Sequence, residues 1–215
     1  MDEQLRSFCV ATAAAVLLLA GCSVPQVYPT VRERNISLQP GDLEAHGIAF
    51  ITPSAATGQE EEKQAIALVF AETLKEQRKN VRVLALAQTL GAINQAGLAD
   101  AYRRMYAYHR ETGLFRADVL EQIAKATQMR YMAQIQVQGF GQHAKERFGV
   151  FGLRIVETKS AAVRLFFQVW DSRDGTVAWE ATEEVHYSYD TVTEEQLTLP
   201  RVVGRAAEDL IAKLP

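Results

Sequence analysis

The chain has 215 residues, and its 23 Lys and Arg residues nearly balance 26 Asp and Glu residues, for a formal net charge of −3. This balance excludes the strongly basic surface of a general nucleic-acid binder. Its two cysteines lie at positions 9 and 22, so a domain that follows them must fold without a disulfide. A domain of this size can do so, because it buries about 70% of the surface of its unfolded chain.

The amino-terminal segment has the shape of a secretory signal peptide. An apolar run from Val10 to Leu19 follows Arg6 and gives way to a polar stretch at Ser23. The alternative is a transmembrane anchor, but the run is shorter than the about 20 residues that span a bilayer. The sequence Leu-Ala-Gly-Cys at 19–22 resembles the lipobox of bacterial lipoproteins.

The lipobox resemblance implies a processed and lipidated chain. Residues 1–21 would be removed, and Cys22 would carry a diacylglycerol on its thiol and an acyl chain, such as palmitate, on its amine. Ser23 stands where an Asp would favour the inner membrane. The resemblance therefore implies a location on the periplasmic face of the outer membrane.

Residues 22–42 contain three prolines and show no hydrophobic period, so we expect a lipidated cysteine followed by an extended tether. Residues 43–215 are expected to form one periplasmic domain. Strands are predicted over 47–51, 81–86, 131–138, 161–171 and 176–189, and helices from Glu60, around 90–93, over 98–113, around 120–127 and from Thr198. This order predicts an α/β (α+β) fold, with a single mixed sheet of about five strands covered by helices.

The connection over 141–160 is too long for a simple hairpin and too apolar to remain solvated. There are three alternatives: residues 150–158 add a further core strand, the segment packs as an extended arm over the sheet, or it is an exposed arm that docks a partner or a second copy of the chain. The alternation of Phe151, Leu153 and Ile155 favours the strand. If it is an arm, the candidate partner contacts are Arg147, Phe148, Phe151, Leu153 and Ile155.

No motif in the chain indicates catalysis or a cofactor. Residues 139–144 match Gly-x-Gly-x-x-Ala after a strand, but the helix that a dinucleotide site requires is broken by further glycines. The aromatic and basic residues over 102–110 fit a helix with an apolar inner face better than a nucleic-acid surface. The four histidines are far apart, with no metal-ligand spacing. We therefore expect no enzyme, no cofactor and no metal.

The order of these elements resembles a family of periplasmic lipoproteins. The resemblance rests on Cys22, the strand at 47–51, the turn at 171–175 before Trp179, and the last helix to Leu214. It is to lipoproteins with an anticodon-binding-like α/β domain: the curli-secretion lipoprotein, the activators of peptidoglycan synthases and the amino-terminal domain of the Tol β-propeller protein. It implies a membrane-anchored protein that binds and regulates, or helps assemble, another cell-envelope protein. The alternatives are a subunit of an oligomeric secretion assembly and an enzyme with no legible site.

Overall fold

The structure is a computed structural model that describes residues 26–55, 60–150, 153–191 and 199–215. Seven strands form one sheet in the order β1-β7-β6-β5-β2-β4, with β3 paired to β5. The strands are β1 (Gln26–Asn35), β2 (Ile48–Phe50), β3 (Ser54–Ala55), β4 (Val83–Leu84), β5 (Tyr131–Val150), β6 (Leu153–Asp171) and β7 (Thr176–Thr191). The helices are α2 (Asp42–His46), α3 (Glu60–Gln77), α4 (Leu86–Gln95), α5 (Ala99–Thr112), α6 (Ala117–Thr127) and α7 (Leu199–Ile211).

The predicted fold class is confirmed, since β2 is parallel to β4 and β5 while β5, β6, β7 and β1 are antiparallel. The sheet has seven strands instead of about five because β1 and β3 were not expected. No helix in the described part of the chain is long and apolar enough to cross a membrane.

The predicted tether is wrong from Gln26 onwards, because residues 26–35 form the edge strand β1. Pro29 is compatible with an edge strand, where a missing N–H leaves no ladder bond unmade. The consecutive charges from Arg32 to Arg34 hide the strand period and protect the edge from pairing with other chains. The folded domain thus begins earlier than residue 43. The predicted signal peptide and Cys22 lie outside the described residues and stay predictions.

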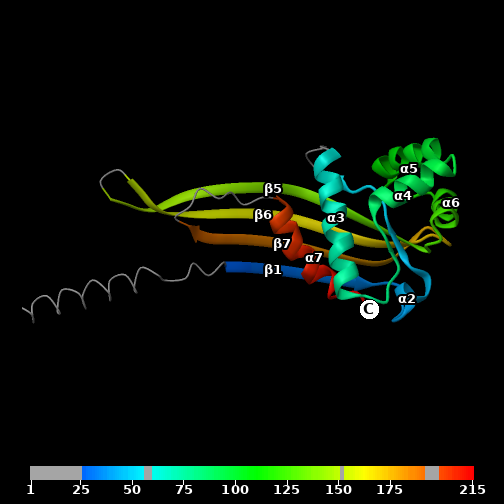
Figure 1. Cartoon of the computed structure of the whole chain (residues 1–215), viewed down its shortest axis with the longest axis horizontal. Coiled ribbons are helices and arrows are strands. Elements are labelled where there is room, and N and C mark those ends of the chain that lie inside the picture. The colour runs from blue at the N-terminus through cyan, green and yellow to red at the C-terminus, as the bar shows by residue number, and fades with distance from the viewer. Residues whose placement is uncertain (1–25, 56–59, 151–152, 192–198) are drawn as a thin grey trace, which may run out of the picture.

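Two apolar cores lie on opposite faces of the sheet, because side chains alternate along each strand. On β2, Ile48 and Phe50 join the core under α3 and α7, whereas Ala49 joins the core under α4, α5 and α6. The buried Ile66, Phe70 and Leu74 recur every four residues along α3, as a helix with one apolar face requires. Figure 1 shows α3 and α7 crossing the strands, and α4, α5 and α6 gathered at one end of the sheet.

The segment 141–160 is the outer part of one long hairpin. The backbones of β5 and β6 stay paired as far as Val150 and Leu153, with register shifts near Phe148. One alternative predicted a further strand over 150–158, but Val150 is the last residue of β5 and residues 153–158 belong to β6, so they form no separate strand. In Figure 1 this part of the hairpin projects beyond α3 and α7. A projecting hairpin agrees with the alternative of an exposed arm. That this arm docks a partner stays a prediction.

Candidate functional site

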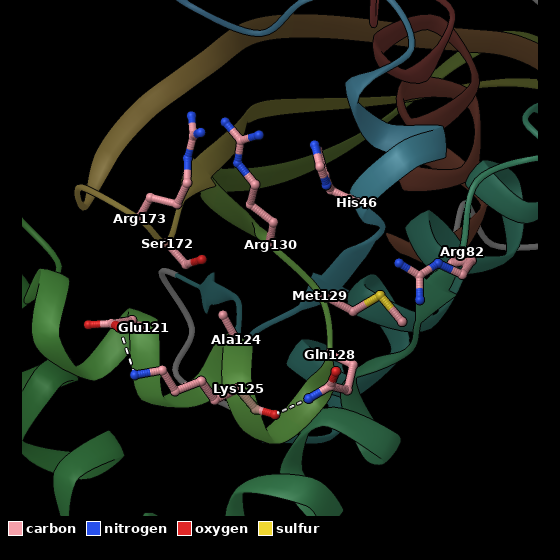
Figure 2. Close-up of a pocket in the computed structure, with 10 residues that line it drawn as sticks. All are labelled: His46, Arg82, Glu121, Ala124, Lys125, Gln128, Met129, Arg130, Ser172 and Arg173. Carbon is pink, nitrogen blue, oxygen red and sulfur yellow. Dashed lines mark hydrogen bonds and ion pairs between the residues drawn. The ribbon is translucent and has the colours of Figure 1, made fainter.

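A cavity of about 550 Å³ lies at the end of the sheet where β2, β4 and β5 begin and β6 ends. Its residues come from the segments just before these three strands, from α6 and from the β6–β7 turn. They are His46, Arg82, Glu121, Ala124, Lys125, Gln128, Met129, Arg130, Ser172 and Arg173. Figure 2 shows the side chains of Arg130, Arg173 and His46 pointing the same way from the strand ends.

Two of the arginines are fixed by Asp171, the last residue of β6. Arg130 donates to Asp171 through Nε (3.1 and 3.2 Å) and Nη2 (2.6 Å). Arg173 donates to the same carboxylate through Nε and Nη2, at 3.0 to 3.3 Å. Burial acts to raise the pKa of Asp171, but the hydrogen bonds from the two arginines outweigh it and hold the pKa at about 2. The carboxylate is therefore charged and both guanidinium planes are oriented.

Close backbone contacts hold the strand starts together around the cavity. The Arg82 carbonyl accepts from the Ile48 amide at 2.9 Å, and the His46 carbonyl accepts from the Arg130 amide at 3.2 Å. Gly47 lies between them at φ 70°, where a Cβ would meet Met129 Sδ at 2.3 Å and the Arg82 carbonyl at 3.0 Å. Only glycine permits this approach without displacement.

The guanidinium of Arg130 also contacts the aromatic ring of Tyr131. Its Cζ lies 4.8 Å from the ring centroid of Tyr131, a cation–π distance. The Tyr131 hydroxyl donates to Asp42 Oδ2 at 3.0 Å, and the Gln39 amide donates to the same oxygen at 2.9 Å. Burial raises the pKa of Tyr131, so its hydroxyl stays a donor. The hydrogen bond from the Gln39 amide lowers the pKa of Asp42.

The cavity carries an excess of positive charge. Its lining contains four permanent cations, Arg82, Lys125, Arg130 and Arg173, and one carboxylate, Glu121 on α6. A second carboxylate, Asp171, is outside the lining and pairs with two of the arginines. Glu121 pairs with Lys125 at 2.7 Å and both are exposed. Among the residues that the structure describes, none pairs with the side chain of Arg82. Arginine forks match carboxylates and phosphates, so the arrangement is suited to an anionic ligand.

A second cavity, of about 900 Å³, lies at the carboxyl end of β2 beneath α5. Two tyrosines of α5 close one side of it. Tyr106 donates to the Thr52 carbonyl at 2.7 Å, and the Thr52 amide donates to the Tyr102 hydroxyl at 2.9 Å. Burial raises the pKa of both tyrosines. His109 stacks on Phe115 at 4.1 Å between ring centroids, and burial lowers its pKa.

These contacts agree with the structural interpretation of 102–110, because Tyr102 is hydrogen-bonded inward and Met105 is fully buried. Residues 139–144 lie within β5, so the Gly-x-Gly-x-x-Ala match lacks the turn and helix of a dinucleotide site. No cluster of three metal-ligating side chains occurs in the described part of the chain.

The candidate contacts named from the sequence are elsewhere. Arg147, Phe148, Leu153 and Ile155 belong to the outer hairpin, at the end of the sheet opposite the cationic cavity, and Phe151 lies outside the described residues. The cavity was not predicted from the sequence, because its cations are scattered along the chain from Arg82 to Arg173. The one available signal was that Arg82 and Arg130 each directly precede a strand start.

No family model and no curated protein matches the chain. Among solved structures, the PelC dodecamer from Paraburkholderia phytofirmans is similar, with a TM-score of 0.43 and 19% identity over 87% of this chain and 94% of that chain. Lipoprotein GNA1162 from Neisseria meningitidis matches with a TM-score of 0.36 and 13% identity over 78% of this chain and 98% of that chain. A PDZ domain protein from Parabacteroides distasonis matches with a TM-score of 0.35 and 10% identity over 96% of this chain and 40% of that chain. At these identities and TM-scores the likenesses assign no family.

Proposed function

We propose that this chain is a non-enzymatic lipoprotein of the periplasmic face of the outer membrane, which binds an acidic segment of another cell-envelope protein in its cationic cavity. The observation that carries the proposal is the cluster of four cations, two of them oriented by Asp171, at the end of the sheet that lies farthest from Gln26. Lipidation of Cys22 is part of the proposal and rests on the lipobox resemblance.

The sheet register supports access to such a partner. Gln26, the first residue of β1, pairs with Ser188, and Asn35 at the other end of β1 pairs with Trp179. Nine residue steps along a strand cover about 30 Å. The cavity lies beyond Asn35 in this direction, next to Asp171 and the β6–β7 turn. A lipid on Cys22 would therefore leave the cavity at the membrane-distal end of the domain.

The chemistry of the cavity supports binding of protein carboxylates. Its cations come from four separate segments, which suits several carboxylates along a chain better than one compact anion. The carboxylate in its lining, Glu121, pairs with Lys125, and the carboxylate next to it, Asp171, pairs with two arginines. Neither is free to act as a general base, which favours binding over turnover.

The proposal is tested by photo-crosslinking in intact cells, with a photoreactive amino acid at Ala124 in the cavity wall. We expect adducts with one envelope protein, and we expect Arg82→Gln with Lys125→Gln to reduce them about tenfold or more, since a hydrogen bond to a charged group contributes about 1.5–3 kcal/mol. The matched control, Arg164→Gln with Lys213→Gln, removes two exposed cations outside the cavity. Adducts that the cavity variant leaves unchanged would contradict the proposal, and adducts only with the same chain would replace it with self-assembly.

Lipidation is tested on the same strain. Fatty-acid label should be incorporated into the mature protein and should disappear in Cys22→Ser. A wild-type protein without the label would remove the membrane from the proposal but leave the cavity's binding function testable.

A further inference from the structure

The outer end of the β5–β6 hairpin is a two-stranded ribbon. The last pair between β6 and β7 joins Glu157 and Thr191, and the corresponding pair between β5 and β6 joins Glu146 and Glu157. Beyond these pairs, residues 147–150 of β5 and 153–156 of β6 are paired only with each other among the described residues. These residues and the pair Glu146–Glu157 at their inner end, ten residues in all, form the ribbon. We infer that this ribbon is a second membrane contact, inserted shallowly into the bilayer that holds the lipid on Cys22. The inference rests on the lipidation included in the proposed function.

The sheet register puts the ribbon and Gln26, which follows Cys22 by four residues in the chain, at the same end of the sheet. Gln26 on β1 pairs with Ser188 on β7, Ser188 pairs with Ser160 on β6, and Ser160 pairs with His143 on β5. These four residues form one row across the sheet. From His143 the hairpin continues seven residues farther, to Val150, in the direction that leads along β1 from Asn35 to Gln26 (Figure 1).

The number of residues beyond this row decides how far Cys22 and the hairpin can each reach. Four residue steps separate Cys22 from Gln26, so Cys22 lies at most about 14 Å beyond the row. The seven hairpin residues extend about 23 Å beyond the same row. When the strands point at the membrane, the hairpin therefore passes the level of Cys22 by at least about 9 Å. When the sheet lies along the membrane, the ribbon meets the surface instead.

The composition of the ribbon suits this location. Five of its ten residues are large and apolar, and the register pairs Phe148 with Val156 and Val150 with Leu153. Arg147 and Arg154 interrupt the apolar residues, and arginine is a residue that places its stem in lipid while its head stays at the headgroups. The acidic pair Glu146 and Glu157 marks the inner end of the ribbon. From the inner to the outer end of the ribbon, the residues thus change from acidic to apolar and basic.

Backbone hydrogen bonding limits the depth of insertion. Each strand of the ribbon has one edge whose N–H and C=O groups find no partner among the described residues. Such groups cannot be left unsatisfied in the hydrocarbon centre of a bilayer. They are satisfied by water and headgroups in the interfacial zone, where amphipathic elements insert by about 5–10 Å. The minimum reach of about 9 Å falls within this zone.

The experiment uses the full chain, processed in cells and reconstituted into vesicles of phosphatidylethanolamine and phosphatidylglycerol. Cys22 is acylated in that protein and Cys9 is removed with the signal peptide, so Leu153→Cys supplies the one free thiol for an NBD fluorophore. A second variant, Val150→Cys, covers the case in which the first does not fold. Arg173→Cys, in the exposed β6–β7 turn at the opposite end of the sheet, is the control position. Circular dichroism establishes that all three variants keep the fold.

We expect the probe at Leu153 to show blue-shifted emission, loss of quenching by iodide and quenching by nitroxide-labelled lipid. A nitroxide near the headgroup should quench it more than one at the end of the acyl chain. The probe at Arg173 should be quenched by iodide alone. Mass spectrometry of the same sample reports the acylation of Cys22.

An acylated protein whose Leu153 and Val150 probes are both quenched by iodide as strongly as the Arg173 probe would overturn the inference and leave the lipid anchor intact. A probe protected from both iodide and lipid nitroxide would also overturn it, in favour of docking onto protein. An unacylated Cys22 would refute the lipid anchor itself. Mass spectrometry detects this outcome independently of the fluorescent probes.

Discussion

Arg130 and Asp171 join the start of β5 to the end of β6 through a bidentate contact, with 2.6 Å between Nη2 and Oδ2. Only 17% of the Arg130 side chain and 5% of the Asp171 side chain are exposed, so the pair is largely removed from water. The Ser172 amide also donates to the Arg130 carbonyl at 3.1 Å, so the same two segments are joined by backbone and side chains. The geometry of the cationic cavity therefore depends on Asp171, although Asp171 is not one of the residues that line it.

Asp171→Asn should destabilise the domain by about 3 kcal/mol, because breaking a largely buried ion pair leaves a charge unpaired. The measurement is chemical denaturation at neutral pH. Asp118→Asn is the matched control, because Asp118 pairs with Arg116 at 2.7 Å but both are more than half exposed. The control should change the stability by less than about 1 kcal/mol. Equal effects of the two substitutions would show that Asp171 has no special structural role.

Most of the fold was predicted from the spacing of apolar residues along the chain. That prediction failed for strands whose conformation depends on pairing with a distant strand. Strands β5, β6 and β7 and helix α3 were predicted because each has an apolar side that a core must cover. β1 was missed because Arg32, Glu33 and Arg34 break the alternation, and its strand conformation comes from pairing with β7. The two-residue strand β3 was missed because it depends on a partner, residues 136–137 of β5, far along the chain.

The cationic cavity could not be predicted from the sequence for a different reason. Arg82 and Arg130 are separated by three helices in the chain, and only the parallel pairing of β2 with β4 and β5 brings their positions together. The sequence contained no pattern for that pairing order. The apolar hairpin was recognised because its residues are adjacent in the chain, although its course as a continuation of β5 and β6 was not.

Glu183 on β7 gives a prediction about pH. Its carboxylate is fully buried beneath α7 near Asp209, and neither of its oxygens has a hydrogen-bond donor among the described residues. Burial and the negative charge of Asp209 raise the pKa of Glu183 to about 8. An acid with a raised pKa in the folded state binds its proton more tightly there than in the unfolded chain. Stability should therefore fall as the pH rises from about 5 to 8, by at most about 1.4 kcal/mol per pH unit.

Glu183→Gln should remove most of this pH dependence and should raise the free energy of unfolding at pH 8 relative to the wild type. Glu184→Gln is the control, because Glu184 is the next residue on β7 but pairs with Arg164 on the exposed side. Denaturation curves at intervals from pH 5 to 8 measure the slope for each protein. A wild-type slope that survives in Glu183→Gln would assign the pH dependence to another group.

Gly175 in the β6–β7 turn allows a steric effect to be separated from a conformational one. Its φ is 73°, and a Cβ at this position would lie 2.7 Å from the Cβ of Ala117 at the start of α6. Gly113 after α5 has a nearly identical φ of 75°, but a Cβ there would meet nothing within 4 Å. Alanine at either position costs about 1 kcal/mol for the left-handed backbone. Gly175→Ala must in addition displace α6 from the turn.

We therefore expect Gly113→Ala to lower the free energy of unfolding by about 1 kcal/mol, and Gly175→Ala to lower it by about 1–3 kcal/mol more, the usual cost of overpacking. Because Lys125 on α6 and Arg173 in the turn both line the cationic cavity, the displacement should also weaken crosslinking from Ala124, whereas Gly113→Ala should not. Equal losses of stability in the two variants would mean that α6 yields to the added methyl group, and that the contact between the turn and the helix is loose.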